Sequence, residues 1–185
     1  MAIFTGLRGF FKKPAPLAPA APTVALDGDN TPVAERRLRE RLNARDDLRV
    51  LIIDDSPTVC AALKKILRSA GCLTTQALDA ETGLEMVKTE RPELIFLDIV
   101  LPRMNGFSAL RHLRRDPETR DIPVIMISGN EQATEQFFGS AIGADDFMKK
   151  PFSRSEVFTR IERLLDGDLV PRRQGPVTAQ APLSA

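Results

Sequence analysis

Short apolar segments recur along the middle of the chain, separated by stretches in which apolar residues return every three or four positions. The apolar segments span residues 49–54, 72–78, 93–98, 123–128 and 145–150. Their nearly continuous apolar character is typical of strands covered on both faces. The stretches that follow them have the periodicity of amphipathic helices, so the pattern predicts strand–helix units joined into a parallel sheet. We therefore expect a doubly wound, five-stranded α/β fold with three layers.

Residue types that favour helix ends support this division. Asp79, Asn105 and Ser153 stand where helix N-caps are expected, because their side-chain oxygens can accept hydrogen bonds from free backbone N–H groups. Gly71 and Gly143 stand where helices should end before the second and fifth strands. These positions set the predicted limits of the helices.

The apolar pattern stops on both sides of this region. Residues 14–32 are rich in proline and alanine, which favours an extended linker. Residues 33–45 then have a four-residue apolar spacing and many arginines, which predicts a short helix. After the last helical stretch the periodicity is lost and prolines return, which is typical of disorder. We expect an extension over 1–47, a folded domain over 48–166 and a disordered tail over 167–185.

Composition narrows the classes of function. The 26 basic and 25 acidic residues leave a net charge of +1, which gives no long-range attraction to nucleic acid or to an anionic membrane. Cys60 and Cys72 lack a CxxC spacing and the chain has one histidine, which argues against a zinc site and a disulfide framework. Without a long apolar run or a signal-peptide pattern, we expect a cytoplasmic protein that does not insert stably into membranes.

Polar residues gather at the predicted carboxyl ends of the strands. Asp54 and Asp55 follow the first strand, Asp98 ends the third, Ser128 ends the fourth and Lys150 ends the fifth. The carboxyl ends of parallel strands share one edge of a sheet, which is where such folds bind ligands. Neighbouring carboxylates repel one another unless a cation holds them, and an all-oxygen cluster suits Mg²⁺. The sequence therefore predicts a magnesium site at this edge.

Such a site suits the transfer of a phosphoryl group. A carboxylate can attack phosphorus to form an acyl phosphate when a metal and a cation neutralise the charge on the phosphoryl oxygens. Asp98 is the candidate nucleophile because it ends an apolar strand, whereas the adjacent Asp54 and Asp55 are placed to hold Mg²⁺. Lys150 supplies the additional positive charge.

Four segments carry a family resemblance: LIIDDS, LIFLDIVLPRMNGF, VIMISG and FMKKPF. In this order and spacing they resemble the motifs of response regulator receiver domains, which have a flavodoxin-like (βα)5 fold. The resemblance implies that Asp98 is the phosphoacceptor and that Asp54, Asp55, Asp98 and the Val100 carbonyl hold Mg²⁺. The segment DIVLPRMNGF is most similar to regulators of chemotaxis and twitching motility.

The same resemblance assigns the remaining site residues. Ser128 and Lys150 occupy the positions of the hydroxyl and the lysine that act in phosphorylation, and Phe147 occupies that of an aromatic switch. The peptide bond between Lys150 and Pro151 is expected to be cis, a geometry that costs little only before proline.

The implied function is two-component signal transduction. The protein would catalyse only its own phosphorylation and dephosphorylation, and would receive its phosphoryl group from a sensor histidine kinase or a phosphotransfer protein. Few residues follow Leu165, so we expect a protein target, not DNA, to bind the face formed by the fourth helix, the fifth strand and the fifth helix.

Two other functions remain open. A phosphohydrolase of the haloacid dehalogenase type also forms an aspartyl phosphate with Mg²⁺. However, it needs a DxD motif, whereas Asp54 and Asp55 are adjacent. A degenerate receiver that serves as a scaffold without phosphorylation is disfavoured because every chemical group of the site is present.

Overall fold

The folded region is a single parallel sheet between two layers of helices. The computed structural model describes residues 44–139 and 143–173. Its strands are ordered β2-β1-β3-β4-β5 and pair in parallel throughout. They are β1 (Arg49–Ile53), β2 (Leu73–Ala77), β3 (Leu94–Asp98), β4 (Val124–Ser128) and β5 (Asp146–Lys149). The predicted doubly wound fold is confirmed, and every strand boundary lies within one residue of its expected position.

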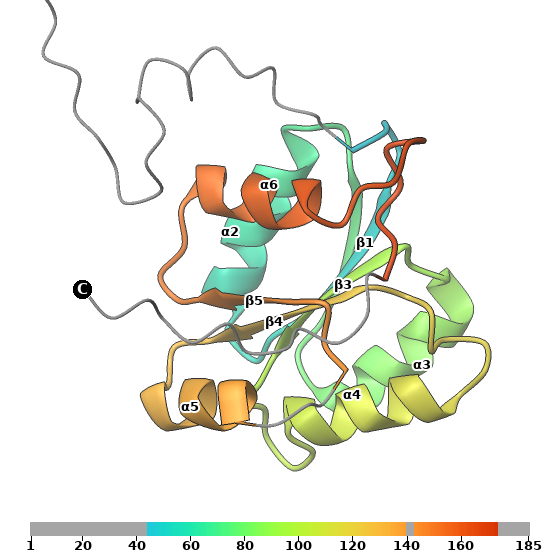
Figure 1. Cartoon of the computed structure of the whole chain (residues 1–185). Helices are drawn as coiled ribbons and strands as arrows, with labels where there is room; N and C mark the ends of the chain where they lie inside the picture. The colour runs from blue at the N-terminus through green and yellow to red at the C-terminus, as the bar shows by residue number, and fades with distance from the viewer. Residues whose placement is uncertain (1–43, 140–142, 174–185) are drawn as a thin grey trace, which may run out of the picture. The chain divides into compact units, whose positions relative to one another are not determined.

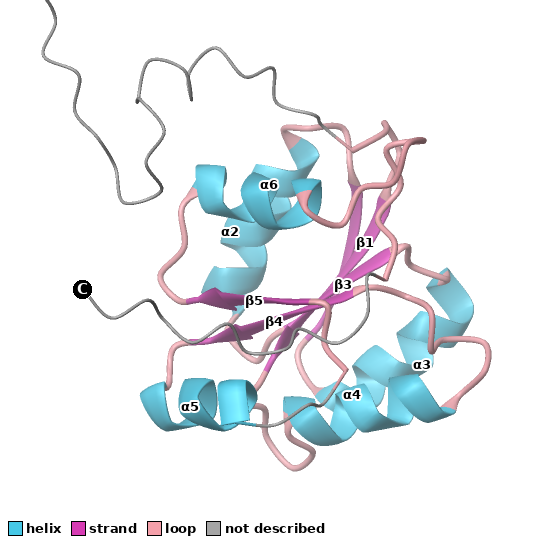
Figure 2. Cartoon of the chain, in the orientation of Figure 1, coloured by secondary structure: helices cyan, strands magenta, loops and turns pink. Residues whose placement is uncertain are grey.

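Helices cover both faces of this sheet. On one face lie α2 (Pro57–Arg68) and α6 (Arg154–Glu162), and on the other lie α3 (Ala80–Glu90), α4 (Gly106–Arg115) and α5 (Glu131–Gly139) (Figure 1). The strands form the middle layer of the three (Figure 2). Among the residues that the structure describes, no helix is long and apolar enough to span a bilayer.

The sheet separates two hydrophobic cores. Successive strand side chains point to opposite faces, so Leu51 and Ile53 of β1 pack with α3, α4 and α5, while Val50 and Ile52 pack with α2 and α6. All residues of β3 and β4 are buried. Burial on both faces explains why these strands have apolar runs instead of alternating polarity.

The predicted helix N-caps are also confirmed. Asp79, Asn105 and Ser153 each accept a hydrogen bond from the backbone N–H three residues further on, at 2.8, 2.9 and 3.1 Å. Gly71 and Gly143, which precede β2 and β5, have φ angles of 82° and 79°. Glycine adopts this left-handed conformation without the steric cost that a Cβ brings.

The C-terminal segment differs from the prediction. We expected disorder from residue 167 onward, but residues 166–173, here called the C-terminal strap, fold back onto the domain. Leu165 and Pro171 form an antiparallel bridge, and Arg173 Nε donates to Asp145 Oδ1 at 3.0 Å. The strap lies beside the start of β1, where the Arg45 N–H donates to the Leu169 carbonyl at 3.1 Å (Figure 1). Long-range ion pairing holds this segment, and sequence periodicity does not report such contacts.

The other predicted features at the chain ends lie outside the described residues. These are the linker over 14–32, most of the Arg-rich helix over 33–45, and the tail beyond 173.

Candidate functional site

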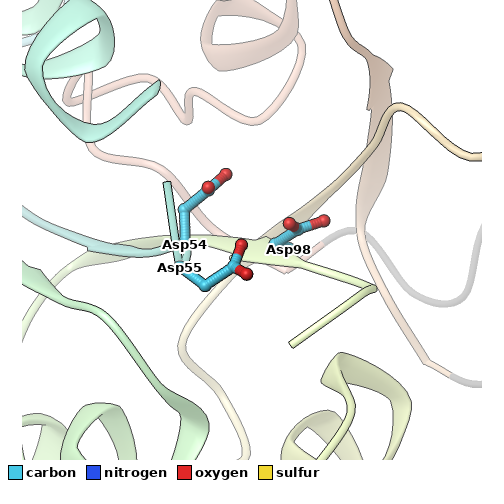
Figure 3. A group of neighbouring side chains, drawn as sticks. All are labelled: Asp54, Asp55 and Asp98. Atoms are coloured by element: carbon cyan, nitrogen blue, oxygen red, sulfur yellow. The ribbon is translucent and has the colours of Figure 1, made fainter. Parts of the chain in front are cut away.

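The sheet register brings the ends of four strands together. Ile53 pairs with Leu97 and Ser128 pairs with Lys149, so that β1, β3, β4 and β5 end at nearly the same level. The polar residues that follow or end these strands therefore meet at one edge, as the sequence predicted. Figure 3 shows three of them, with the carboxyl groups of Asp54, Asp55 and Asp98 gathered at this edge.

The three carboxylates can approach a single cation. Each of Asp54, Asp55 and Asp98 offers an oxygen within 4.8 Å of the oxygens offered by the other two. Asp54 is fully buried, Asp98 is 4% exposed and Asp55 is exposed. A cluster with two buried members and one at the surface leaves an open side, which suits an ion that keeps part of its water shell.

The orientation of Asp54 supports a metal at this position. Its Oδ1 accepts a hydrogen bond from the Ser56 N–H at 3.0 Å. Its Oδ2 is buried and lies 2.6 Å from Lys150 Nζ, in an ion pair whose geometry is not that of a regular hydrogen bond. Buried carboxylate oxygens nearly always have a hydrogen-bond partner or bind a cation. Lys150 is the cation beside Oδ2 in this structure, and the oxygen-only donor set of the three carboxylates fits Mg²⁺.

Lys150 connects two of the carboxylates. Its Nζ lies 2.6 Å from Asp54 Oδ2 and donates to Asp98 Oδ2 at 2.8 Å, and its side chain is 19% exposed. Burial alone would lower the pKa of Lys150, but its contacts with Asp54 and Asp98 outweigh burial and raise the pKa above its ordinary value. The ammonium group is therefore positively charged at neutral pH.

The backbone around Lys150 fixes the base of this side chain. Its N–H donates to the Ser128 carbonyl at 2.8 Å, which ties the end of β5 to the end of β4. The bond to Pro151 is cis, as the family resemblance implied.

Asp98 is held at the end of β3. Its Oδ1 accepts a hydrogen bond from the Val100 N–H at 3.3 Å, and its Oδ2 faces Lys150. Burial raises the pKa of Asp98 above its ordinary value, and the nearby Asp54 adds to this, while the lysine opposes the shift. Val100 itself is 50% exposed, so the loop beside Asp98 is open to solvent.

Ser128 lies in the same cluster of strand ends. The residue is fully buried, and its Oγ accepts a hydrogen bond from the Asn130 N–H at 3.1 Å and donates to the Asn130 carbonyl at 3.3 Å. Its hydroxyl thus holds the loop between β4 and α5 in this structure.

Phe147 lies within β5, in contact with α5. It is 7% exposed and stacks on Phe137 with a centroid separation of 4.8 Å, while the ring of Phe138 meets it edge-on at 5.4 Å. Phe138 is 47% exposed. The three rings, here called the phenylalanine cluster, join the buried core to the surface of α5.

Sequence reasoning missed the requirement for Gly106. A Cβ added at Gly106 would lie 2.0 Å from the Asp98 carbonyl oxygen, so only glycine lets α4 begin this close to the end of β3. The segment MNGF contains the signal, because glycine directly after an N-cap residue indicates a close backbone approach.

Cys60 of α2 is fully buried. It also contacts the site, because its Sγ donates to the Asp54 carbonyl at 3.3 Å. Burial raises the pKa of the Cys60 thiol to about 11, with a further contribution from the Asp54 charge, so the thiol is neutral.

Comparison with known proteins agrees with the fold. Residues 50–162 match the response regulator receiver domain family. Protein PilH of Pseudomonas aeruginosa is 36% identical over 119 residues, a match that covers 64% of this chain and 98% of PilH. The DNA-binding dual master transcriptional regulator RpaA of a Synechocystis species is 37% identical, a match that covers 70% of this chain but only 58% of RpaA.

Solved structures show the same relationship. The chemotaxis protein CheY4 of Vibrio cholerae has a TM-score of 0.59 and 25% identity, over 64% of this chain and 99% of CheY4. The receiver domain of the Francisella response regulator 1452 has a TM-score of 0.55 and 30% identity, over 62% of this chain and 93% of that domain. The resemblance to receiver domains is confirmed, which argues against the phosphohydrolase alternative. The chain belongs to the response regulator receiver domain family and is a two-component signalling protein.

Proposed function

We propose that this protein accepts a phosphoryl group on Asp98 and signals through phosphorylation-dependent binding to another protein. The observation that carries the proposal is the position of Lys150, whose Nζ lies 2.6 and 2.8 Å from the carboxylates of Asp54 and Asp98. A cation beside a candidate nucleophile neutralises phosphoryl charge during transfer. The phosphoryl donor is a sensor histidine kinase or a phosphotransfer protein.

In the proposed reaction, a carboxylate oxygen of Asp98 attacks the phosphorus of a phosphohistidine. A phosphorus–oxygen bond forms as the phosphorus–nitrogen bond breaks, and the departing imidazole takes a proton from solvent. Lys150 stays protonated, and its ammonium group would contact the phosphoryl oxygens once they carry the negative charge. Hydrolysis ends the phosphorylated state: water attacks the phosphorus of the acyl phosphate, the bond to the Asp98 oxygen breaks, and inorganic phosphate and the free carboxylate of Asp98 are released.

Asp54, Asp55, Asp98 and the Val100 carbonyl would hold Mg²⁺. When bound, Mg²⁺ neutralises the carboxylates and the phosphoryl oxygens, so that two groups of like charge can meet. Ser128 would exchange its hydrogen bonds to Asn130 for one to a phosphoryl oxygen. That exchange would draw the β4–α5 loop toward Asp98 and change the face formed by α5, β5 and α6.

Several observations support a protein target. The match to PilH covers nearly all of PilH, whereas the match to RpaA covers about half of a protein whose name includes DNA binding. The net charge of +1 gives no general attraction to DNA.

The two free, buried cysteines are compatible with the reducing cytoplasm in which we place the protein.

The test is transfer of radiolabelled phosphate from acetyl phosphate to the full chain. We expect near-stoichiometric labelling of the wild type in Mg²⁺, none in the Asp98→Asn variant, and none in excess chelator. The Asp121→Asn variant is the matched control, because the Asp121 side chain is 82% exposed.

Labelling of the Asp98→Asn variant would overturn the assignment of the phosphoacceptor, and full labelling in chelator would overturn the metal. A wild type that takes no label would identify the scaffold alternative. Specific binding of the phosphorylated protein to DNA would contradict the proposed output.

A further inference from the structure

The loop between β3 and α4 has a strained backbone at Arg103. This loop, residues 99–105, starts directly after Asp98 and ends at the N-cap of α4. Arg103 has a φ angle of 62°, in the left-handed region that residues with a Cβ adopt at an energetic cost. Its side chain is 66% exposed, so burial does not explain the conformation. Some other contact must favour it.

The guanidinium group of Arg103 supplies that contact. Its Nε lies 3.2 Å from Glu81 Oε1, and its Nη2 lies 3.3 Å from both Glu81 Oε2 and Asp79 Oδ2. A guanidinium fork that meets a carboxylate through two nitrogens fixes direction as well as distance. The hydrogen bonds from Arg103 lower the pKa of Glu81 below its ordinary value.

Both carboxylates belong to the beginning of α3. Asp79 is the N-cap of this helix and also accepts from the Thr82 N–H at 2.8 Å, and Glu81 is in its first turn. Arg103 therefore fastens the loop after the phosphoacceptor strand to a rigid helix end. We call these contacts of Arg103 with Asp79 and Glu81 the loop clamp.

The loop clamp acts on the part of the backbone that borders the site. Between Asp98 and Arg103 lie four residues, among them Val100, whose N–H already donates to Asp98 Oδ1 at 3.3 Å. Leu101 is 8% exposed and anchors the middle of the loop in the core. The base of the loop is closed by the Gly106 N–H, which donates to the Ile99 carbonyl at 2.9 Å. The clamp adds a fourth attachment, through the exposed side chain of Arg103.

We propose that Arg103 is a positioning residue for the metal and phosphoryl site, because the loop clamp fixes the backbone that carries the Val100 carbonyl, an expected ligand of Mg²⁺. This inference rests on the proposed function of that site. Arg103 touches neither Asp98 nor its neighbours in the acidic cluster, so it acts only through the loop.

The expected effect is on metal affinity, with little change in global stability. Exposed ion pairs stabilise folded proteins only slightly, but a loop released from one attachment samples more conformations, and few of them can bind the metal. We expect the Mg²⁺ concentration for half-maximal phosphorylation by acetyl phosphate to rise about three- to tenfold, with a nearly unchanged rate at saturating Mg²⁺.

The main variant is Arg103→Asn in the full chain. Asparagine accepts left-handed φ angles better than most residues, so the change removes the clamp without adding backbone strain. Glu81→Gln should shift the half-saturation in the same direction. The charge-exchanged pair Arg103→Glu with Glu81→Arg should recover part of the affinity. Arg111→Gln is the control, because Arg111 is exposed and donates a hydrogen bond to Ser108 Oγ on its own helix.

Two further readouts separate positioning from folding. The melting temperature of Arg103→Asn should match that of the wild type, and Mg²⁺ titration should shift the amide resonances of Val100 and Gly106 at correspondingly higher concentrations. The difference between Arg103→Asn and the wild type in the Mg²⁺ concentration for half-maximal phosphorylation should become smaller in high salt, because salt screens the exposed ion pairs of the clamp.

An unchanged Mg²⁺ half-saturation in Arg103→Asn would overturn the inference. A loss of phosphorylation that persists at saturating Mg²⁺, together with a lower melting temperature, would also overturn it. Arg103 would then be needed for folding and not for positioning the loop. Failure of the proposed function is distinguishable, because in that case the wild type itself takes no label on Asp98.

Discussion

Lys150 forms ion pairs with both Asp54 and Asp98, and both of these carboxylates are buried. In the part of the chain that the structure describes, no other cationic side chain is paired with them. Removing Lys150 would leave two buried negative charges facing each other. Breaking a buried ion pair by deleting one partner costs more than the pair contributes, because the remaining charge stays desolvated. The stability of the metal-free protein should therefore depend strongly on this residue.

We predict that Lys150→Met destabilises the protein in EDTA at pH 7 by about 3 kcal/mol. Urea unfolding measures this, with Lys149→Met as the matched control. Lys149 Nζ is 3.5 Å from Glu131 and its side chain is 56% exposed, so its loss should cost less than about 0.5 kcal/mol. Adding Mg²⁺ should stabilise Lys150→Met more than the wild type. Equal effects of the two lysines would contradict this picture.

Gly106 controls the same site through the backbone. An added Cβ would lie 2.0 Å from the Asp98 carbonyl oxygen and 2.9 Å from Ile99 Cα, and both atoms belong to rigid backbone. We predict that Gly106→Ala costs about 3 kcal/mol, since the start of α4 must move away from the end of β3. Gly129→Ala is the control, because its Cβ would meet Lys150 Cβ at an ordinary 3.5 Å. Similar melting temperatures for the two variants would show that α4 can shift freely.

Among the elements, the C-terminal strap has little local support in the sequence but a buried anchor. The Asp145 side chain is fully buried, and its two oxygens meet Arg114 Nη2 at 2.8 Å and Arg173 Nε at 3.0 Å. It also accepts from the Val124 N–H at 2.8 Å. Arg114 donates further to three backbone carbonyls, those of Gly143, Arg120 and Ile122. The strap thus completes a network that holds the start of β5.

We predict that Arg173→Met lowers the free energy of unfolding by about 2 kcal/mol, because buried Asp145 loses one of its two cations. Arg172→Met should cost no more than about 0.5 kcal/mol, since the Arg172 side chain is 65% exposed and pairs with a surface-facing Asp166. Urea unfolding of the two variants at pH 7 makes the comparison. Equal losses would mean that the strap only lies on the surface.

The elements differ in how far their sequences predict them. The strands were located within one residue because their apolar runs reflect burial on both faces, and the helix ends because Asp79, Asn105 and Ser153 act through neighbours three residues away. The strap was missed because its defining contact joins residues 28 positions apart. The loop clamp joins Arg103 to residues at least 22 positions away, and it was missed for the same reason.

The site was predicted better than its surroundings. Asp54, Asp55, Asp98 and Lys150 were expected at one edge of the sheet, and parallel topology alone brings their strand ends together. The distances, the ion pair of the buried Asp54 Oδ2 with Lys150 and the close approach at Gly106 depend on tertiary packing. Their roles in phosphorylation remain predictions from the family resemblance.

At the scale of the whole molecule, β5 connects the site to the proposed output face. It lies between Lys150, which contacts the carboxylates, and Asp145, which the strap holds, and Phe147 lies in between. The family resemblance implies an inward turn of this aromatic residue. In this structure Phe147 is already buried within the phenylalanine cluster. The proposed signal is therefore a repacking of Phe147 against Phe137 and Phe138, and the half-exposed Phe138 presents that repacking to a partner.

This arrangement predicts that Phe147→Ala separates phosphorylation from output. Lys150 contacts Asp54 and Asp98, whereas the Phe147 ring packs on Phe137 and Phe138, so labelling of Asp98 by acetyl phosphate should stay within about twofold of the wild type. Loss of the ring removes the link from β5 to α5, so beryllofluoride should no longer shift the α5 amide resonances, and capture of a partner on the beryllofluoride-treated protein should weaken about tenfold. Phe147→Leu keeps most of the buried volume and guards against a folding defect, since a truncated core aromatic residue can cost several kcal/mol. If Phe147→Leu and Phe147→Ala both retain the beryllofluoride-induced shifts in α5 and full partner affinity, the signal does not pass through the phenylalanine cluster.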